Sequence, residues 1–170
     1  MILIRYASIR SLDISNGEGA GVALFVQGCP FRCHNCFNPE TWDFNGGKEW
    51  TKETEKQFIE LVNRPYIKRI SILGGEPLAD ENLEDVLNLV NKIRLLLPEK
   101  TIWIYSGYTW AECMEHSIRR DIVSKCDIFV DGKYVDKMRD VTLKWRGSTN
   151  QKVINVKESL AQNKIILESR

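Results

Sequence analysis

Short apolar runs separated by polar segments recur along the chain. Most are bounded by glycine, proline or charged residues, which is typical of buried strands. These runs predict strands at Val22–Gly28, Arg69–Leu73, Thr101–Tyr105, Cys126–Val130 and Lys152–Val156. Two further short strands, Ile2–Tyr6 and Ser11–Ile14, are expected before them and are joined by a turn.

Segments with helical periodicity alternate with these strands. Three helices are predicted to begin at the capping residues Thr51, Asp80 and Thr109. The second helix carries an apolar stripe that reaches Leu97, and we assign this stripe to the core. The third helix is expected to run through His116, which we place on the surface.

This alternation predicts an α/β fold with parallel strands and helices packed outside them. A complete barrel of eight such units needs about 250 residues, and the chain has 170. We therefore predict a single domain over residues 1–170, folded as a partial, open (β/α) barrel of the TIM type. Residues 1–20 would form the N-terminal strands and turn, and residues 157–170 a tail that is mobile at its end.

Composition limits the kinds of partner and the cell compartment that we expect for this protein. With 43% hydrophobic and 28% charged residues, the chain can bury a core and stay in solution. The net charge of +1 predicts neither a nucleic-acid nor a membrane partner held by bulk charge. No apolar stretch approaches the ~20 residues of a membrane span, and the N-terminal run is too short for a signal peptide. A cytoplasmic protein is expected.

Three of the five cysteines, Cys29, Cys33 and Cys36, have the spacing C-x3-C-x2-C. They begin the loop that follows the predicted strand Val22–Gly28. Thiolates placed together suit zinc or an iron–sulfur cluster. Because a closed zinc site and a fully ligated cubane each need four ligands, three cysteines would leave one iron of a cubane open.

Spacing alone leaves other interpretations open. His34, Cys113 or Cys126 could complete a zinc site, or the cysteines could be unrelated buried thiols. We expect Cys113 to be a structural thiol. An odd number of cysteines, three of them clustered, argues against a secreted disulfide framework and for a reducing compartment.

Several sequence blocks resemble a known family. The cysteine loop after Gln27-Gly28 is similar to the cluster loop of radical S-adenosylmethionine enzymes. The flanking segments Gly17–Gly21 and Phe37–Trp42 resemble the glycyl-radical activating enzymes of that superfamily, although Asn35 stands where the superfamily usually has an aromatic residue. Four later blocks are similar to the anaerobic ribonucleotide reductase activating proteins: Gly74–Pro77, Tyr105–Tyr108, Val130–Tyr134 and Arg146–Gln151.

This resemblance implies a reaction and its participants. Cys29, Cys33 and Cys36 would hold one [4Fe–4S] cluster per chain, and its open iron would bind the amino and carboxylate groups of S-adenosylmethionine. Reductive cleavage would give a 5′-deoxyadenosyl radical that takes hydrogen from a glycine of the large subunit of anaerobic ribonucleotide reductase. The implied reductant is flavodoxin or a thioredoxin- or formate-linked donor.

The resemblance also implies which residues bind S-adenosylmethionine. They are Asn35, Cys36, Phe37, Gly74, Gly75, Glu76, Asp131 and Lys133. The first three would line the adenine through the backbone, and the glycines would meet the methionine end. Without the resemblance, the glycines fit a tight turn after a strand, and the Asp-Gly-Lys segment fits a solvated loop.

Two other functions remain as alternatives. One is activation of a different glycyl-radical enzyme, such as pyruvate formate-lyase, whose activator has overlapping signatures. The short chain and the block Arg146–Gln151 favour the reductase. The resemblance also implies a substrate-side or partner-facing role for this block, which otherwise fits a solvated turn. The other is a zinc-binding structural or interaction module without catalysis, against which the block Gly74–Pro77 argues.

Overall fold

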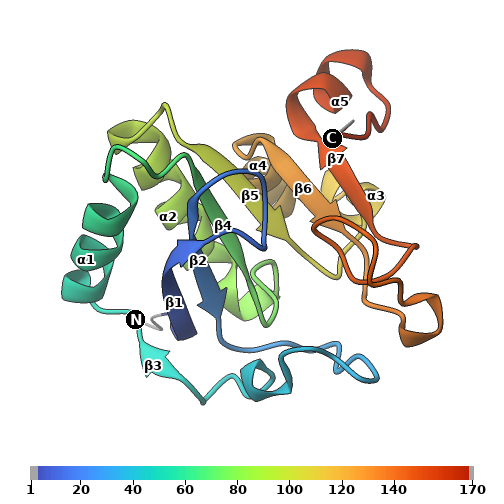
Figure 1. The fold of residues 1–170 in the computed structure, drawn as a ribbon, viewed down its shortest axis with the longest axis horizontal. Helices are drawn as coiled ribbons and strands as arrows, with labels where there is room; N and C mark the ends of the chain where they lie inside the picture. The colour runs from blue at the N-terminus through green and yellow to red at the C-terminus, as the bar shows by residue number, and fades with distance from the viewer. Residues whose placement is uncertain (1–3, 169–170) are drawn as a thin grey trace.

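One open sheet of seven strands, in the order β3-β1-β2-β4-β5-β6-β7, organises the computed structural model, which describes residues 4–168 (Figure 1). The strands are β1 (Arg5–Asp13), β2 (Gly21–Val26), β3 (Lys48–Glu49), β4 (Arg69–Gly74), β5 (Thr101–Tyr105), β6 (Ile128–Asp131) and β7 (Lys152–Asn155). The α-helices are α1 (Lys52–Val62), α2 (Leu83–Leu96), α3 (Trp110–Met114), α4 (Ser117–Ser124) and α5 (Val156–Gln162). Short 3-10 turns are η1 (Pro39–Thr41), η2 (Asp80–Asn82) and η3 (Asp136–Met138).

The central strands β2, β4, β5 and β6 are parallel, as the alternation of strands and helices predicts. The loops that follow them therefore meet at one edge of the sheet. Strand β7 was expected to be parallel as well, but it pairs antiparallel with β6. The reason is the connection: residues 132–151 contain no α-helix that could return the chain across the sheet.

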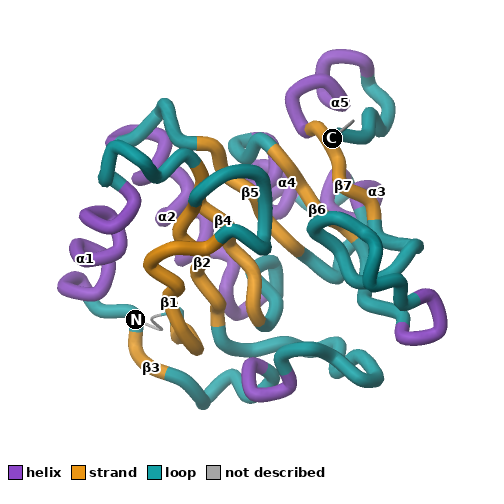
Figure 2. Tube along the Cα trace, viewed as in Figure 1, coloured by secondary structure: helices purple, strands orange, loops and turns teal. Residues whose placement is uncertain are grey.

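The two faces of the sheet have different partners because side chains alternate along each strand. Val22, Leu24 and Val26 of β2 join the main core, which the helices α1, α2, α3 and α4 complete. Ala23 and Phe25 point to the opposite face, where loops and not helices cover the sheet (Figure 2). The helix-free face is therefore available for a cavity.

The N-terminal region differs from the prediction. One strand, β1, takes the place of two short strands and a turn, and it pairs antiparallel with β2. The pairing with β2 shifts register between Tyr6 and Ser8 and again between Arg10 and Asp13. These irregularities allow β1 to stay paired although its polar and apolar residues do not alternate regularly. Residues 1–3, part of the predicted first strand, lie outside the described residues. The short strand β3, which the sequence did not predict, pairs with β1.

Two of the three predicted helix caps are confirmed. The hydroxyls of Thr51 and Thr109 accept hydrogen bonds from backbone N–H groups in the first turns of α1 and α3. Asp80 caps no helix: it opens η2, and its carboxylate binds Arg119 at 2.7 Å. The predicted third helix is two helices, because the side chain of His116 caps a new one, α4.

The segment predicted as a tail begins with a helix. Residues 157–162 belong to α5, and the chain then returns so that Leu167 pairs with Ile154 of β7. Helix α5 lies at one end of the molecule, opposite β3 (Figure 1). Residues 169 and 170 lie outside the described part. Within residues 4–168, no helix has the length and apolar character to cross a membrane.

Candidate functional site

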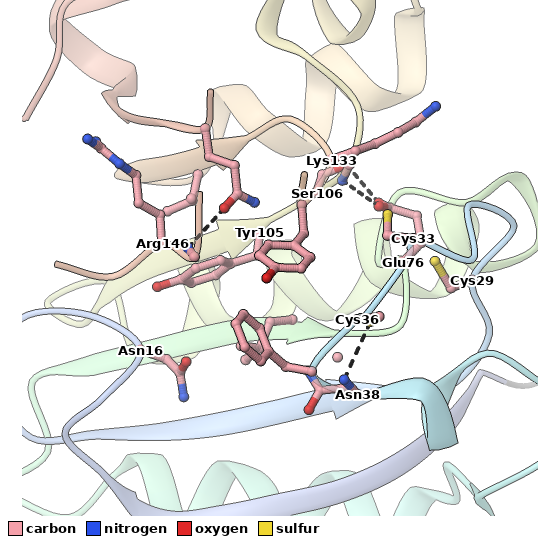
Figure 3. A pocket seen from close by; sticks show the side chains of 18 of the residues that line it. Asn16, Cys29, Cys33, Cys36, Asn38, Glu76, Tyr105, Ser106, Lys133 and Arg146 are labelled. Carbon is pink, nitrogen blue, oxygen red and sulfur yellow. Dashed lines mark hydrogen bonds between the residues drawn. The ribbon is translucent and has the colours of Figure 1, made fainter. Parts of the chain in front are cut away.

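A cavity of about 560 Å³ opens over the edge of the sheet where the four parallel strands end (Figure 3). Its floor comes from the helix-free face, and its walls from the loops that follow β2, β4, β5 and β6. The floor residues are Phe25, Leu73, Tyr105 and Val130. This volume lies within the range of about 300–1,000 Å³ that is typical of small-molecule sites.

Cys29, Cys33 and Cys36 all line this cavity, so the structure brings the three predicted cysteines to one place. The start of their loop is held by two backbone hydrogen bonds, from Gly28 N to Thr41 O at 2.7 Å and from Cys29 N to Trp42 O at 3.1 Å. A turn follows, in which Cys36 N donates to Cys33 O at 3.1 Å. All three cysteines are free thiols.

The thiols also influence one another electrostatically. Burial raises the pKa of Cys29, and the negative charge of Glu76 adds to this effect. Burial and the neighbouring Cys36 raise the pKa of Cys33, whereas the Lys133 ammonium opposes the shift. A thiol must lose its proton to bind metal, and burial disfavours the resulting thiolates. The positive charge of bound iron or zinc would stabilise them.

Three cysteines that share one cavity, with no histidine or fourth cysteine among the described residues that line it, suit a cubane with one open iron. Among residues 4–168, no three side chains of His, Cys, Asp or Glu converge closely enough to hold one metal ion. The residues considered as a fourth zinc ligand are not placed to complete a zinc site: His34 is exposed, and Cys113 and Cys126 do not line the cavity. A cubane is larger than an ion, so its sulfur ligands stand farther apart. The buried indole N–H of Trp42, at the cavity wall, has no partner within the described chain and could donate to cluster sulfur.

The segment Gly74–Glu76 is clamped beside the cysteine loop. Gly75 N donates to Val26 O at 2.9 Å, and Glu76 N donates to Gly28 O at 2.7 Å. A Cβ on Gly75 would lie 2.5 Å from the carbonyl oxygen of Gly28, so glycine is required for this close approach. The predicted glycines therefore lie against the predicted cluster loop.

Glu76 joins this segment to the loop after β5. Its buried carboxylate accepts hydrogen bonds from Ser106 Oγ and Gly107 N, both at 2.7 Å, and from Leu78 N at 2.9 Å (Figure 3). Burial raises the pKa of Glu76 to about 7, although these hydrogen bonds and Arg119 oppose the shift. The carboxylate thus positions two loops of the cavity wall.

The remaining predicted contacts divide between the cavity and its surroundings. Phe37 and Lys133 line the cavity, and Lys133 Nζ lies 4.6 Å from the ring centroid of Phe31. Asp131 does not line it: its carboxylate accepts from Trp110 N at 2.8 Å and from Lys152 N at 3.2 Å. The side chain of Asn35 also lies outside and donates to Asp136 at 3.0 Å.

Sequence reasoning named no site residue in the part of the cavity that lies away from the cysteines. Asn16, Tyr105 and Arg146 line this part, and none was predicted as a site residue (Figure 3). Alternation along the strand Thr101–Tyr105 is the signal that places Tyr105 on the helix-free face. The resemblance implies a substrate-side or partner-facing role for the loop Arg146–Gln151, and Gln151 Oε1 holds this loop by accepting from Gly147 N at 3.0 Å.

Comparisons with known proteins place the chain in a family. A family model described as "4Fe-4S single cluster domain" matches residues 15–154. Several relatives carry the name anaerobic ribonucleoside-triphosphate reductase-activating protein, among them the three that follow. The one from Escherichia coli K12 is 41% identical over 152 residues, which cover 88% of this chain and 97% of the relative. Those of Vibrio cholerae and bacteriophage T4 are 37% and 34% identical over 150 residues, covering 87% and 88% of this chain and 96% and 93% of the relatives. Since these matches extend over most of both chains, this protein belongs to the family of anaerobic ribonucleoside-triphosphate reductase-activating proteins.

Proposed function

We propose that this protein activates an anaerobic ribonucleotide reductase by generating a glycyl radical on it, and that it does so as a radical S-adenosylmethionine enzyme. The observation that carries the proposal is that Cys29, Cys33 and Cys36 line one cavity together with Gly74–Glu76. The names of the relatives identify the partner class.

Cys29, Cys33 and Cys36 would hold a [4Fe–4S] cluster, in agreement with the matching family model. When bound, such a cluster supplies the single electron for reductive cleavage of S-adenosylmethionine. The chain provides binding, orientation and a sheltered space for this chemistry. Three protein ligands leave one iron for the amino and carboxylate groups of the cosubstrate.

The walls of the cavity suggest where S-adenosylmethionine lies. Gly74 and Gly75 offer backbone close to the cysteine loop, as the methionine end requires. We propose Cys36 and Phe37, with the backbone of Asn35, along the adenine. Lys133 lines the cavity and provides a cation for the carboxylate end.

Glu76 and Asp131 act on the cosubstrate indirectly in this proposal. Glu76 is bonded to Ser106 and Gly107, so it fixes the wall on which the cosubstrate rests. Asp131 joins the start of α3 to the start of β7, and it thereby orients the loop that carries Lys133. Both residues are positioning residues.

We also propose that the fold is a partial TIM-type barrel of the radical S-adenosylmethionine superfamily and that residues 1–170 form one such domain. The four parallel strands and the cavity at their C-terminal ends support this assignment. The five free thiols suit a reducing compartment such as the cytoplasm. Flavodoxin or a thioredoxin- or formate-linked system is the proposed source of electrons.

The experiment is anaerobic reconstitution with iron and sulfide, followed by mixing with the reductase, S-adenosylmethionine and a reductant. We expect a glycyl radical signal in electron paramagnetic resonance that requires all components. Cys33→Ser should lose the brown absorbance and the signal, whereas Cys113→Ser, a buried thiol outside the cavity, should retain both. A Cys33→Ser protein with full iron content would contradict the proposal. A signal with pyruvate formate-lyase instead of the reductase would favour the alternative partner.

A further inference from the structure

The cavity has a second end, which lies away from the cysteines. Asn16, Tyr105 and Arg146 line it, and Figure 3 shows them on the opposite side of the cavity from Cys29. We call this region the outer end. The functions assigned above use the cysteine end and leave the outer end unexplained.

Two buried polar atoms at the outer end have no hydrogen-bond partner within residues 4–168. They are the hydroxyl of Tyr105 and Nε of Arg146. A buried polar group without a partner costs free energy, and native proteins contain few of them. A ligand that accepts hydrogen bonds in the cavity would satisfy both groups.

Packing holds the Tyr105 hydroxyl in this position. Tyr105 packs against two small apolar clusters, one that contains Trp103 and Val130 and one that contains Phe25 and Leu73. The side chain therefore has little freedom to turn toward another protein group. Burial raises the pKa of Tyr105, so the hydroxyl keeps its proton and remains a donor.

Asn16 supplies an acceptor at the same end. Its amide nitrogen donates to Asp13 Oδ1 at 2.8 Å, and a carboxylate can only accept, so the amide oxygen points away from Asp13. Figure 3 shows this oxygen on the side of Asn16 that faces Tyr105. Arg69 and Ser71 fix the residue, because both donate to the Asn16 carbonyl, at 3.3 and 2.5 Å.

Carboxylates offset part of the positive charge at the outer end. Arg10 is already engaged, since it lies 3.6 Å from the Asp13 carboxylate and 4.7 Å from the centroid of the Phe25 ring. Asp140 lines the same cavity, and hydrogen bonds from Thr142 lower its pKa, so it carries a negative charge. Two more guanidinium groups line the cavity: Arg146, whose charge also lowers the pKa of Asp140, and Arg139, which lies 5.7 Å from the centroid of the Phe37 ring. The outer end therefore offers directed donors and one acceptor with part of its positive charge offset, a combination that suits a peptide main chain.

The rim of the cavity is apolar and exposed, as expected where a protein partner approaches. Phe37 is 59% exposed and Val141 is 81% exposed, and both line the cavity. The rim therefore gives a protein segment an apolar surface to cross on its way into the cavity.

We propose that the outer end binds the main chain of an extended peptide segment of the reductase. Tyr105 and Arg146 donate hydrogen bonds to peptide carbonyl oxygens, and the amide oxygen of Asn16 accepts one from a peptide N–H. The proposal rests on the proposed function and adds the residues that hold the substrate segment. They are positioning residues, which direct the segment toward the cysteine end.

The first test measures peptide binding directly. A fluorescent peptide that spans the glycine-bearing segment of the reductase is titrated with anaerobically reconstituted protein, and its anisotropy is followed. We expect Tyr105→Phe and Arg146→Gln each to raise the Kd about tenfold, the effect of one lost hydrogen bond. Tyr66→Phe is the matched control, because Tyr66 is exposed and does not line the cavity. An unchanged Kd in both cavity variants, or displacement of the peptide by a nucleoside triphosphate, overturns the proposal.

The second test separates positioning from a structural role. In glycyl radical formation, both cavity variants should raise the KM for the reductase about tenfold, with a much smaller change in the KM for S-adenosylmethionine. Tyr105→Phe should not lower the Tm, because the hydroxyl has no partner in the free protein. A lower Tm, or an equal rise of both KM values, overturns the proposal.

These tests also distinguish this inference from the proposed function. If the wild-type protein forms no glycyl radical, only the proposed function is rejected. Weaker peptide binding by Tyr105→Phe would still support the outer end as a peptide site. Conversely, a wild-type radical signal with unchanged KM values in both variants rejects only the inference.

Discussion

Single side chains around the cavity act mainly by holding loops in place. Glu76 binds the loop after β5, and Gln27 Nε2 donates to the carbonyls of Glu40 and Asp43 at 2.9 and 2.8 Å, which holds the segment that follows the cysteines. The sequence motifs predicted that Glu76 and Asp131 belong to the site. They did not predict that both carboxylates are occupied by protein donors, because the donors come from distant parts of the chain.

The role of Glu76 predicts a loss of stability in Glu76→Gln. An amide offers one acceptor oxygen where the carboxylate uses two, so an NH₂ group would face a backbone N–H or the Ser106 hydroxyl. We expect the free energy of unfolding to fall by about 1–3 kcal/mol in urea denaturation. Glu60→Gln, on the exposed side of α1, should change it by less than about 0.5 kcal/mol. Equal stability of the two variants would contradict the assigned role.

The thiols should differ in reactivity. Burial raises the pKa of Cys113 and Cys126 to about 12, so both are neutral at pH 8, whereas Cys33 and Cys36 are partly exposed. In the folded, iron-free protein, iodoacetamide should alkylate Cys33 and Cys36 more than about tenfold faster than the buried pair. Mass spectrometry of the labelled peptides measures the rates. Rapid labelling of Cys113 would show that α3 is not packed as described.

At the scale of elements, the sequence predicted most of the sheet because apolar runs and capping residues are local signals. The central strands and the caps at Thr51 and Thr109 follow from such signals. The reversed direction of β7 and the role of Asp80 did not follow from local signals, because both depend on long-range partners. One long-range contact matters most for the cavity: buried Arg69 of β4 binds the loop that carries Asn16.

This contact predicts a large cost for Arg69→Met. The guanidinium lies 3.0 Å from the carboxylate of Asp13, and both side chains are almost fully buried. Removal of one partner leaves a buried charge, so we expect a loss of about 3–5 kcal/mol in the free energy of unfolding. Lys92→Met, which breaks an exposed ion pair with Glu55, should cost at most about 1 kcal/mol. A similar small cost for both variants would show that Arg69 does not hold the loop.

At the scale of the whole molecule, the open sheet gives the cavity two different ends. Helices occupy one face, and loops from four parallel strands enclose the cavity on the other. The cysteine end was predictable from a compact motif. At the outer end, only the block that begins at Arg146 was expected to face a substrate or partner. Asn16 and Tyr105 were not expected there, because they come from separate segments and no spacing rule connects them with Arg146. Together the two ends suit a protein that binds a small cosubstrate beside a peptide.

The central claim is that three cysteines hold a cubane and leave one iron open. Mössbauer spectroscopy of protein reconstituted with ⁵⁷Fe, recorded with and without S-adenosylmethionine, tests it most directly. The account predicts a [4Fe–4S] spectrum in which one iron of the four changes on addition of S-adenosylmethionine, while the other three stay the same. Four irons that do not respond, or a protein that takes up zinc in a closed tetrahedral site and no cluster, would contradict it.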